Sequence, residues 1–153
     1  GELLPKLTGS FKVGYRQLDV DNSTTPDEDD SSLGLDANLT WSATPKLTHD
    51  ITVARDFGSA SVGSRVEESS VNLRSSYAIT GQWTGSTSLG YSLREYIGQN
   101  RDDAYITAGL RANYSLNQYW NFGGGYSYSD NDSDLVGSSF DNHKIDLSAS
   151  LRY

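Results

Sequence analysis

Residues 142–153, NHKIDLSASLRY, separate into two unlike sets when the stretch is read at every second position. The first set is mostly apolar: His143, Ile145, Leu147, Ala149, Leu151 and Tyr153. The second set is polar: Lys144, Asp146, Ser148, Ser150 and Arg152. Successive side chains of a strand point to opposite sides, so the alternation predicts a β-strand with one apolar and one polar face. One such strand would suit a soluble sheet equally well.

Seven earlier segments alternate in the same manner, and no stretch shows helical periodicity instead. They are residues 7–16, 33–42, 47–57, 70–79, 83–94, 105–116 and 120–129. Short turns at 44–46, 80–82 and 117–118 alternate with longer polar segments at 19–32, 58–65, 98–103 and 130–141. The pattern predicts an all-β fold, an up-and-down antiparallel meander of eight strands, with tight turns at one end and long loops at the other.

Composition narrows the class of protein. The chain has 153 residues, enough for one domain, but only 35% of them are hydrophobic, which is little material for an aqueous core. Ten Tyr, three Trp and four Phe argue against disorder. No run approaches the length of a transmembrane helix, and the lack of Cys excludes a disulfide scaffold or thiolate metal site. The net charge of −8 disfavours nucleic acid as a partner.

The aromatic residues indicate which face meets water. Trp41, Trp83 and Trp120 all lie on the apolar face within three residues of a tight turn, and Tyr153 lies near the same end. Near the long loops, the apolar face carries other aromatic residues: Tyr15, Phe57, Tyr126 and Tyr128. Two aromatic groups around an aliphatic band are typical of a transmembrane β-barrel of the outer membrane, with its apolar face in lipid. The alternative is a soluble, lipocalin-like barrel whose apolar face points inward.

Specific motifs add a family resemblance. The ending LSASLRY at 147–153, with its terminal aromatic residue, resembles the signal that the outer-membrane assembly machinery recognises. The stretches PKLTGSFKVGYR at 5–16, LTWSATP at 39–45, ANYSLN at 112–117 and GGGYSY at 123–128 resemble the outer-membrane β-barrel porin family associated with exopolysaccharide secretion. Members of that family are typically longer, so residues 1–153 resemble the C-terminal part of such a barrel. The resemblance implies a porin-like channel or membrane component of polysaccharide export.

The polar face, assigned to the lumen, carries charges of both signs. They are Lys12, Arg16, Asp36, Asp50, Asp56, Arg74, Arg94, Arg111, Lys144, Asp146 and Arg152. In a closed barrel of eight strands the interior is just wide enough for side chains, so these charges would have to pair in a sealed polar plug. In a wider barrel they would form a basic stripe that attracts anionic solutes such as acidic polysaccharide. Both interpretations stay open at this point.

Two further kinds of site receive less support. Asp130, Asp132, Asp134 and Asp141 have the spacing of a calcium-binding loop, but Leu135 stands where such loops need Gly, so we expect no metal or other cofactor. His143 with Ser138 or Ser139 and Asp141 could in principle form a Ser–His–acid unit. Because Ser and Asp are abundant in this loop, proximity by chance explains the grouping, and we expect no enzyme.

Together these observations predict one outer-membrane β-barrel domain over residues 1–153, with periplasmic termini and extracellular long loops. The expected function is that of a porin-like channel or membrane component. The alternative is a small closed barrel that acts as an anchor, an adhesin or a partner-binding protein through its acidic loops. Expected partners are outer-membrane lipid and lipopolysaccharide, the assembly machinery through the last strand and, for an open pore, anionic polysaccharide.

Overall fold

The computed structural model describes the whole chain except residues 1, 5, 19–29, 60–64, 98–100 and 153. Within these bounds the fold is all-β, and eight long strands follow one three-residue strand. They are β1 (Glu2–Leu4), β2 (Leu7–Leu18), β3 (Asp30–Thr44), β4 (Leu47–Ser59), β5 (Arg65–Ala78), β6 (Trp83–Ile97), β7 (Arg101–Ser115), β8 (Trp120–Ser133) and β9 (Phe140–Leu151). The predicted eight strands are confirmed, with β1 as an addition.

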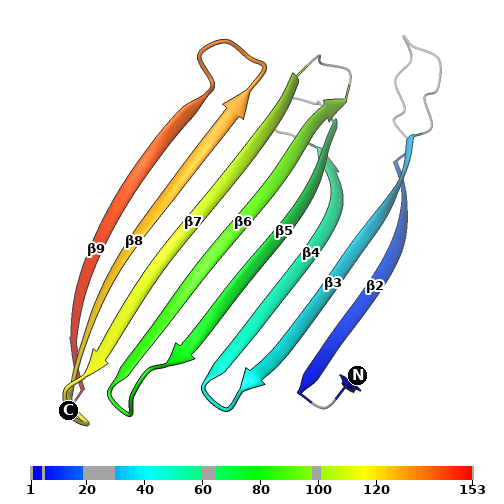
Figure 1. Ribbon diagram of the computed structural model, residues 1–153. Helices are drawn as coiled ribbons and strands as arrows, with labels where there is room; N and C mark the ends of the chain where they lie inside the picture. Colours follow the sequence, from blue (N-terminus) through cyan, green and yellow to red (C-terminus); the bar gives the residue numbers. More distant parts are fainter. Residues whose placement is uncertain (1, 5, 19–29, 60–64, 98–100, 153) are drawn as a thin grey trace.

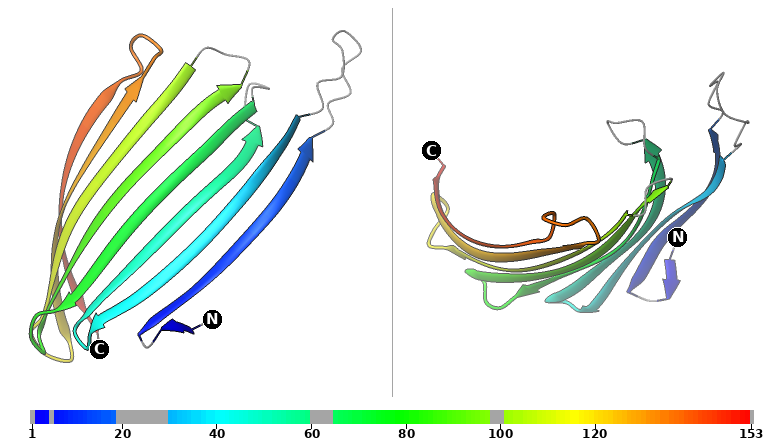
Figure 2. Two further views of the ribbon diagram at one scale, coloured as in Figure 1. Left: turned by 45° about the vertical axis from the view of Figure 1, so that its right-hand side comes forward. Right: turned by 90° about the horizontal axis from the view of Figure 1, so that it is seen from above.

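Every strand pairs with its neighbours in the chain, in antiparallel orientation, so the sheet runs β1 to β9 in sequence order (Figure 1). This is the predicted up-and-down meander. Seen from above, the sheet is strongly curved (Figure 2). Among the described residues β9 pairs only with β8, so β1 and β9 form the two edges. The described part of the chain contains no helix long and apolar enough to cross a membrane.

Each tight turn is held by a polar side chain near its start. Thr44 Oγ1 accepts a hydrogen bond from the backbone N–H of Lys46 at 3.2 Å. Thr80 Oγ1 accepts from the N–H of Trp83 at 3.0 Å, and Asn117 Oδ1 accepts from the N–H of Trp120 at 2.9 Å. Side chains of Thr and Asn stabilise turns in this way because they satisfy N–H groups that the strand ladder leaves unpaired. Two of the three turns therefore bind directly to the tryptophan that begins the next strand.

The strands extend farther toward the long loops than the sequence pattern predicts. β7 begins at Arg101 and β8 continues to Ser133, so Asp103 and Asp130 belong to strands rather than to the predicted loops 98–103 and 130–141. The prediction of these loop boundaries is wrong. Beyond the apolar band both faces of a strand meet water, so the alternation of apolar and polar residues ends there. The backbone pairing does not depend on that alternation and continues.

The two faces of the sheet differ in how closely their side chains lie together. Large side chains on the apolar face are widely exposed, as Phe11 (67%) and Leu110 (60%) show. On the polar face the side chains are close together: a Cβ added to Gly90 would lie 2.5 Å from Thr107 Oγ1 and 2.6 Å from Asn72 Oδ1. Side chains spread apart on the outer side of a curved sheet and converge on its inner side. The apolar face is therefore convex, and the polar face is concave.

The turn between β7 and β8 provides a test of local stability. Replacing Asn117 by Ala removes the acceptor for the N–H groups of Tyr119 and Trp120, both at 2.9 Å. We expect Asn117→Ala to lower the free energy of unfolding by about 1 kcal/mol, the usual worth of such hydrogen bonds. Urea unfolding of the protein in lipid vesicles measures this change. The neighbouring Gln118→Ala serves as the control, and an equal loss in both variants would contradict the assignment.

Candidate functional site

The three tryptophans are staggered regularly across the sheet. Following the cross-strand partners of Trp41 leads to Thr87 on β6 and to Tyr126 on β8. Trp83 lies four residues from Thr87, and Trp120 lies six residues from Tyr126, both toward the tight turns. From β3 to β8 the sheet is about 24 Å wide at 4.8 Å per strand, and six residues along a strand span about 20 Å. These lengths place the tryptophans on one line when the strands tilt by roughly 40°, as strands of transmembrane barrels do.

On β6 a second aromatic residue lies nearer the long loops. Tyr91 is eight residues from Trp83 on β6, and both side chains belong to the convex apolar face. Eight residues span about 26 Å along the strand, or about 20 Å along the axis of a barrel with 40° tilt. An apolar band of nearly this height is what an outer-membrane barrel presents to lipid. Trp41, Trp83 and Trp120 thus share one level of the sheet, and their place at a membrane interface stays a prediction. The side chain of Tyr153, predicted with them, lies outside the described residues.

Three cations on the concave face have the same stagger as the tryptophans. The cross-strand partners of Lys12 lead to Ser70 on β5 and to Tyr105 on β7. Arg74 lies four residues from Ser70, and Arg111 lies six residues from Tyr105, both toward the tight turns. Lys12, Arg74 and Arg111 therefore lie on a line parallel to that of the tryptophans. Along the barrel axis, this line of cations lies about 10 Å from the tryptophans toward the long loops, near the middle of the apolar band.

Acidic side chains pair with only some of the cations on the concave face. Asp146 binds Arg111, with Nη2 to Oδ2 at 2.5 Å. Asp50 accepts a hydrogen bond from Thr40 at 2.7 Å, and Asp36 accepts one from Asn38 at 2.8 Å. Lys12, Arg74 and Lys144 make no hydrogen bond or ion pair with the described part of the chain. The middle of the concave face therefore carries cations whose charge the described side chains do not neutralise.

The remaining predicted lumen charges lie away from this line. Arg94 binds Glu68 through Nε at 2.9 Å, and Glu68 is also the cross-strand partner of Asp56. Arg152 follows β9, and its backbone N–H donates to the carbonyl of Tyr119 at 2.9 Å. Arg16 belongs to β2, but its side chain is outside the described ones.

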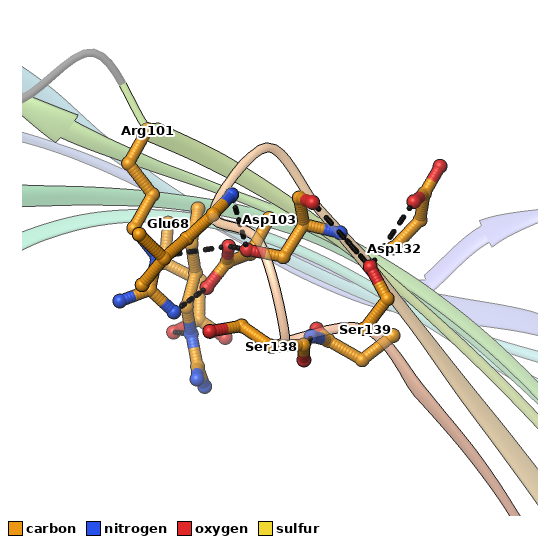
Figure 3. A network of polar contacts seen from close by, with 10 residues as sticks. Glu68, Arg101, Asp103, Asp132, Ser138 and Ser139 are labelled. Carbon is orange, nitrogen blue, oxygen red and sulfur yellow. Dashed lines mark hydrogen bonds and ion pairs between the residues drawn. The ribbon is translucent and has the colours of Figure 1, made fainter.

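A polar network covers the loop end of the concave face (Figure 3). Its centre is Asp103, which is only 6% exposed and the one buried charged residue among those described. Arg101 donates to both oxygens of Asp103, at 3.0 and 2.6 Å, and the guanidinium lies 4.4 Å from the centre of the Tyr96 ring. The hydroxyl of Ser133 also donates to Asp103, and the backbone N–H of Ser133 donates to Ser139 Oγ at 3.0 Å. The network thus joins β7 to β8 and to the segment before β9.

Glu68, Arg101 and Asp103 were not among the residues predicted from the sequence. The sequence pattern predicts a loop at residues 98–103, which includes Arg101 and Asp103, although both continue the alternation of Tyr105 and Thr107 on the polar face. Extending the alternation backward by two residues at a time would have placed Asp103 on the polar face, where the structure pairs it with Arg94. The strand prediction depended on apolar residues at every second position, and these residues end at the edge of the apolar band. The pattern therefore did not reach Asp103.

The catalytic alternative is not supported by the geometry around His143. Its Nδ1 lies 2.7 Å from the hydroxyl of Tyr126, and its Nε2 lies 3.5 Å from the carboxylate of Asp141. Ser139 Oγ instead donates to Asp132 at 3.5 Å, while the carbonyl of Ser138 accepts from Asn131. Neither Ser138 nor Ser139 is a partner of the imidazole, so these residues do not assemble the Ser–His–acid unit considered for His143.

The candidate calcium ligands are not gathered in one loop. Asp130 and Asp132 belong to β8, and Asp130 is the cross-strand partner of Asp141 on β9. Asp134 follows the end of β8, where its N–H donates to the carbonyl of Asp102 at 3.1 Å. Throughout the described ranges no three His, Asp or Glu side chains group so as to hold a metal ion.

A charge placed on the convex face should destabilise the protein. Leu110 is 60% exposed near the middle of the apolar band, so Leu110→Lys would put an ammonium group into lipid. We expect it to lower the free energy of unfolding by about 2–4 kcal/mol, as for Lys at a bilayer midplane. Asn113→Lys, on the concave face of the same strand, should change it by less than about 1 kcal/mol. Unfolding in vesicles compares the two, and equal losses would contradict the assignment of the faces.

The pH dependence of stability should reveal the Asp103 network, which lies beyond the apolar band. The hydrogen bond from Arg101, followed by that from Ser133, lowers the pKa of Asp103 below its ordinary value of 3.8 despite the opposing effect of burial. Because the folded pKa is the lower one, this stabilisation is fully present above about pH 4 and is lost as the pH falls through the folded value.

Asp103→Asn should therefore lower stability at neutral pH by about 1–2 kcal/mol and flatten the dependence of stability on pH below about pH 4. Unfolding curves measured across this range test the prediction. Asp102→Asn, at the exposed neighbouring position, is the control. If the slope of the wild type were unchanged in Asp103→Asn, the network would not act as described.

Three comparisons with known proteins show what the chain is similar to. The model of the family described as "Putative beta-barrel porin 2" matches residues 2–153. Among curated proteins none matches the chain. One similar solved structure is that of the outer membrane protein AlkL in DMPC lipid bilayers, determined by solid-state NMR. It has 18% sequence identity and a TM-score of 0.37, over 95% of this chain and 88% of that one. The chain thus belongs to the family of putative beta-barrel porin 2, and it is a porin-like β-barrel protein of the bacterial outer membrane.

Proposed function

We propose that the protein is an outer-membrane channel whose lumen is lined by the concave face and favours anionic solutes. The observation that carries this proposal is the line of Lys12, Arg74 and Arg111 at mid-height on that face. Of these three, only Arg111 is paired with an acid in the described part of the chain. A wet lumen would hydrate the other two.

The unpaired cations favour an open channel over a sealed plug. In a dry interior a charge without a partner is strongly unfavourable, because the desolvation of an isolated ion costs several kcal/mol even after relaxation. Arg74 is exposed, and its cross-strand neighbours Asp50 and Ser88 do not bind it. A plug would be expected to pair Arg74 with Asp50, whereas Asp50 accepts from Thr40 instead.

Unneutralised positive charge in a narrow aqueous passage raises the local concentration of anions. The solutes that fit this proposal are small organic anions and acidic polysaccharide. Export of polysaccharide is part of the proposal and is supported by the resemblance noted for residues 5–16, 39–45, 112–117 and 123–128. No enzymatic step, nucleic acid or cofactor is needed for this function.

The orientation in the membrane is also proposed. The tight turns and the C-terminal end of β9, where Leu151 pairs with Trp120, lie at the end marked by the tryptophans. We assign this end to the periplasm, and the acidic segments lie at the other, extracellular end. Short periplasmic turns and longer external loops are the rule for outer-membrane barrels. In this orientation the convex face meets lipid, the outer segments lie beside lipopolysaccharide, and β9 is the part that the assembly machinery would recognise.

Conductance tests the channel directly. The full chain is reconstituted in planar bilayers under a KCl gradient, and the reversal potential gives the ratio of anion to cation permeability. We expect anion preference in the wild type and a decrease of about threefold or more in the double variant Lys12→Gln and Arg74→Gln, because the field in the lumen weakens. Lys46→Gln, which removes a cation from the β3–β4 turn, is the control. A correctly folded protein without conductance would refute the proposal.

A further inference from the structure

A hollow of about 330 Å³ lies on the concave face over the central and C-terminal strands. Charged side chains surround it: Arg74 from β5, Arg111 from β7, and Lys144 and Asp146 from β9. Its floor consists of small residues: Ser86, Ser88, Gly109, Gly125 and Ser127. This volume is at the lower end of the range for small-molecule sites in proteins. The hollow is therefore large enough for a ligand rather than for water alone.

The strand register explains how the hollow is built. Arg74, Ser88, Gly109, Ser127 and Lys144 are successive cross-strand partners from β5 to β9. The two cations at the ends of this row are about 19 Å apart at the backbone, at 4.8 Å per strand. Three small residues separate them and leave the space open. The long side chains of Arg74 and Lys144 can reach over that floor from opposite sides.

Arg111 enters the hollow from the next row, where Asp146 fixes it. Its Nη2 donates to Asp146 Oδ2 at 2.5 Å, and the two side chains lie across Gly125. A Cβ at Gly125 would lie 2.7 Å from Asp146 Oδ1 and 3.3 Å from Arg111 Nη2. The absence of a side chain at position 125 thus allows the ion pair to lie on the floor. Arg111 keeps its other donors, because a guanidinium has five N–H groups.

The charges around the hollow do not balance. Three cations face one carboxylate, and Asp146 is already engaged by Arg111. Arg74 and Lys144 have no partner among the described side chains, and Ser88 and Ser127 contribute hydroxyl donors. The hollow therefore offers charge-assisted hydrogen bonds to an anion. Such bonds are stronger than hydrogen bonds between neutral groups.

We propose that this hollow is a binding site for one anionic group, a carboxylate or a phosphate, carried by a solute of about the size of a monosaccharide. The site deepens the proposed function and rests on it in one respect, since solutes reach it through the lumen. Arg74 and Lys144 bind the anionic group, Arg111 supplies a further donor held in place by Asp146, and the serines bind neutral hydroxyls. Each group on a longer chain can occupy the site in turn.

Isothermal titration of the detergent-solubilised full chain tests the site without requiring conductance. The probes are galacturonate, galactose 1-phosphate and the neutral sugar galactose. We expect saturable binding of at least one anionic probe and none of galactose at the same concentrations. Arg74→Gln and Lys144→Gln should each weaken binding by about tenfold, the usual effect of losing one charged hydrogen-bond partner. The control is Lys12→Gln, which removes the same charge from the same face outside the hollow, and it should weaken binding less than twofold.

The outcomes separate the site from the channel. If Lys12→Gln weakens binding as much as Lys144→Gln, only the general field of the lumen attracts the anion, and the site is refuted. If galactose binds as well as the anions, the cations are not the recognition elements, and the site is refuted. The stronger of the two anionic probes identifies the carboxylate or the phosphate as the ligand group.

Conductance completes the separation. Anion-selective conductance without binding of either anionic probe overturns the site alone. Binding that depends on Arg74 and Lys144 without conductance supports the site and overturns the channel. Circular dichroism and heat-modified gel mobility of each variant show that it is folded before it is titrated, so a loss of binding cannot come from a loss of the barrel.

Discussion

Backbone hydrogen bonding between neighbouring strands, in one fixed register, is the constraint on which the other features of this protein depend. A strand that slipped by one residue would move every side chain to the opposite face, into lipid or out of it. The register also determines which residues share a level, because the strands tilt. Trp41, Trp83 and Trp120 on one face and Lys12, Arg74 and Arg111 on the other follow the same stagger. The level of the tryptophans on the convex face and the level of the cations on the concave face are thus both set by the same strand register.

The sequence predicted the fold well because its signal is local. The alternation of unlike faces appears wherever one face meets lipid, so eight strands, their order and the three tight turns could be read directly. The same signal ends where lipid ends, and the extensions of β7 and β8 with Asp103 were therefore missed. The lumen charges were assigned to a face but not to a level, since levels depend on cross-strand register. Which of them pair, as Arg111 does with Asp146 while Arg74 does not, depends on distances between strands that no single segment encodes.

On the concave face, whether a charged side chain is paired depends on its position along the barrel axis. Near the long loops the acids and bases are paired in a dense network around Asp103, which joins neighbouring strand ends. Near the middle, small residues replace large ones, and Arg74 and Lys144 have no acid partner among the described side chains. Paired charges stabilise the structure and attract solutes only weakly. Unpaired charges do not stabilise it, but they attract solutes of opposite charge. Such a division suits the proposed channel, because a channel needs a stable entrance and an interior that solutes can enter.

The stagger of the tryptophans also bears on the dimensions of the molecule. In a closed barrel the offset between strands, summed once around the ring, is the shear number, and together with strand number it determines radius and tilt. Six residues of offset over the five steps from β3 to β8 correspond to about 1.2 residues per strand. The shear number of a barrel built with this offset exceeds its strand number by about one fifth, whatever that strand number is. The tilt is then the same for a narrow or a wide ring, and only the number of strands sets the bore.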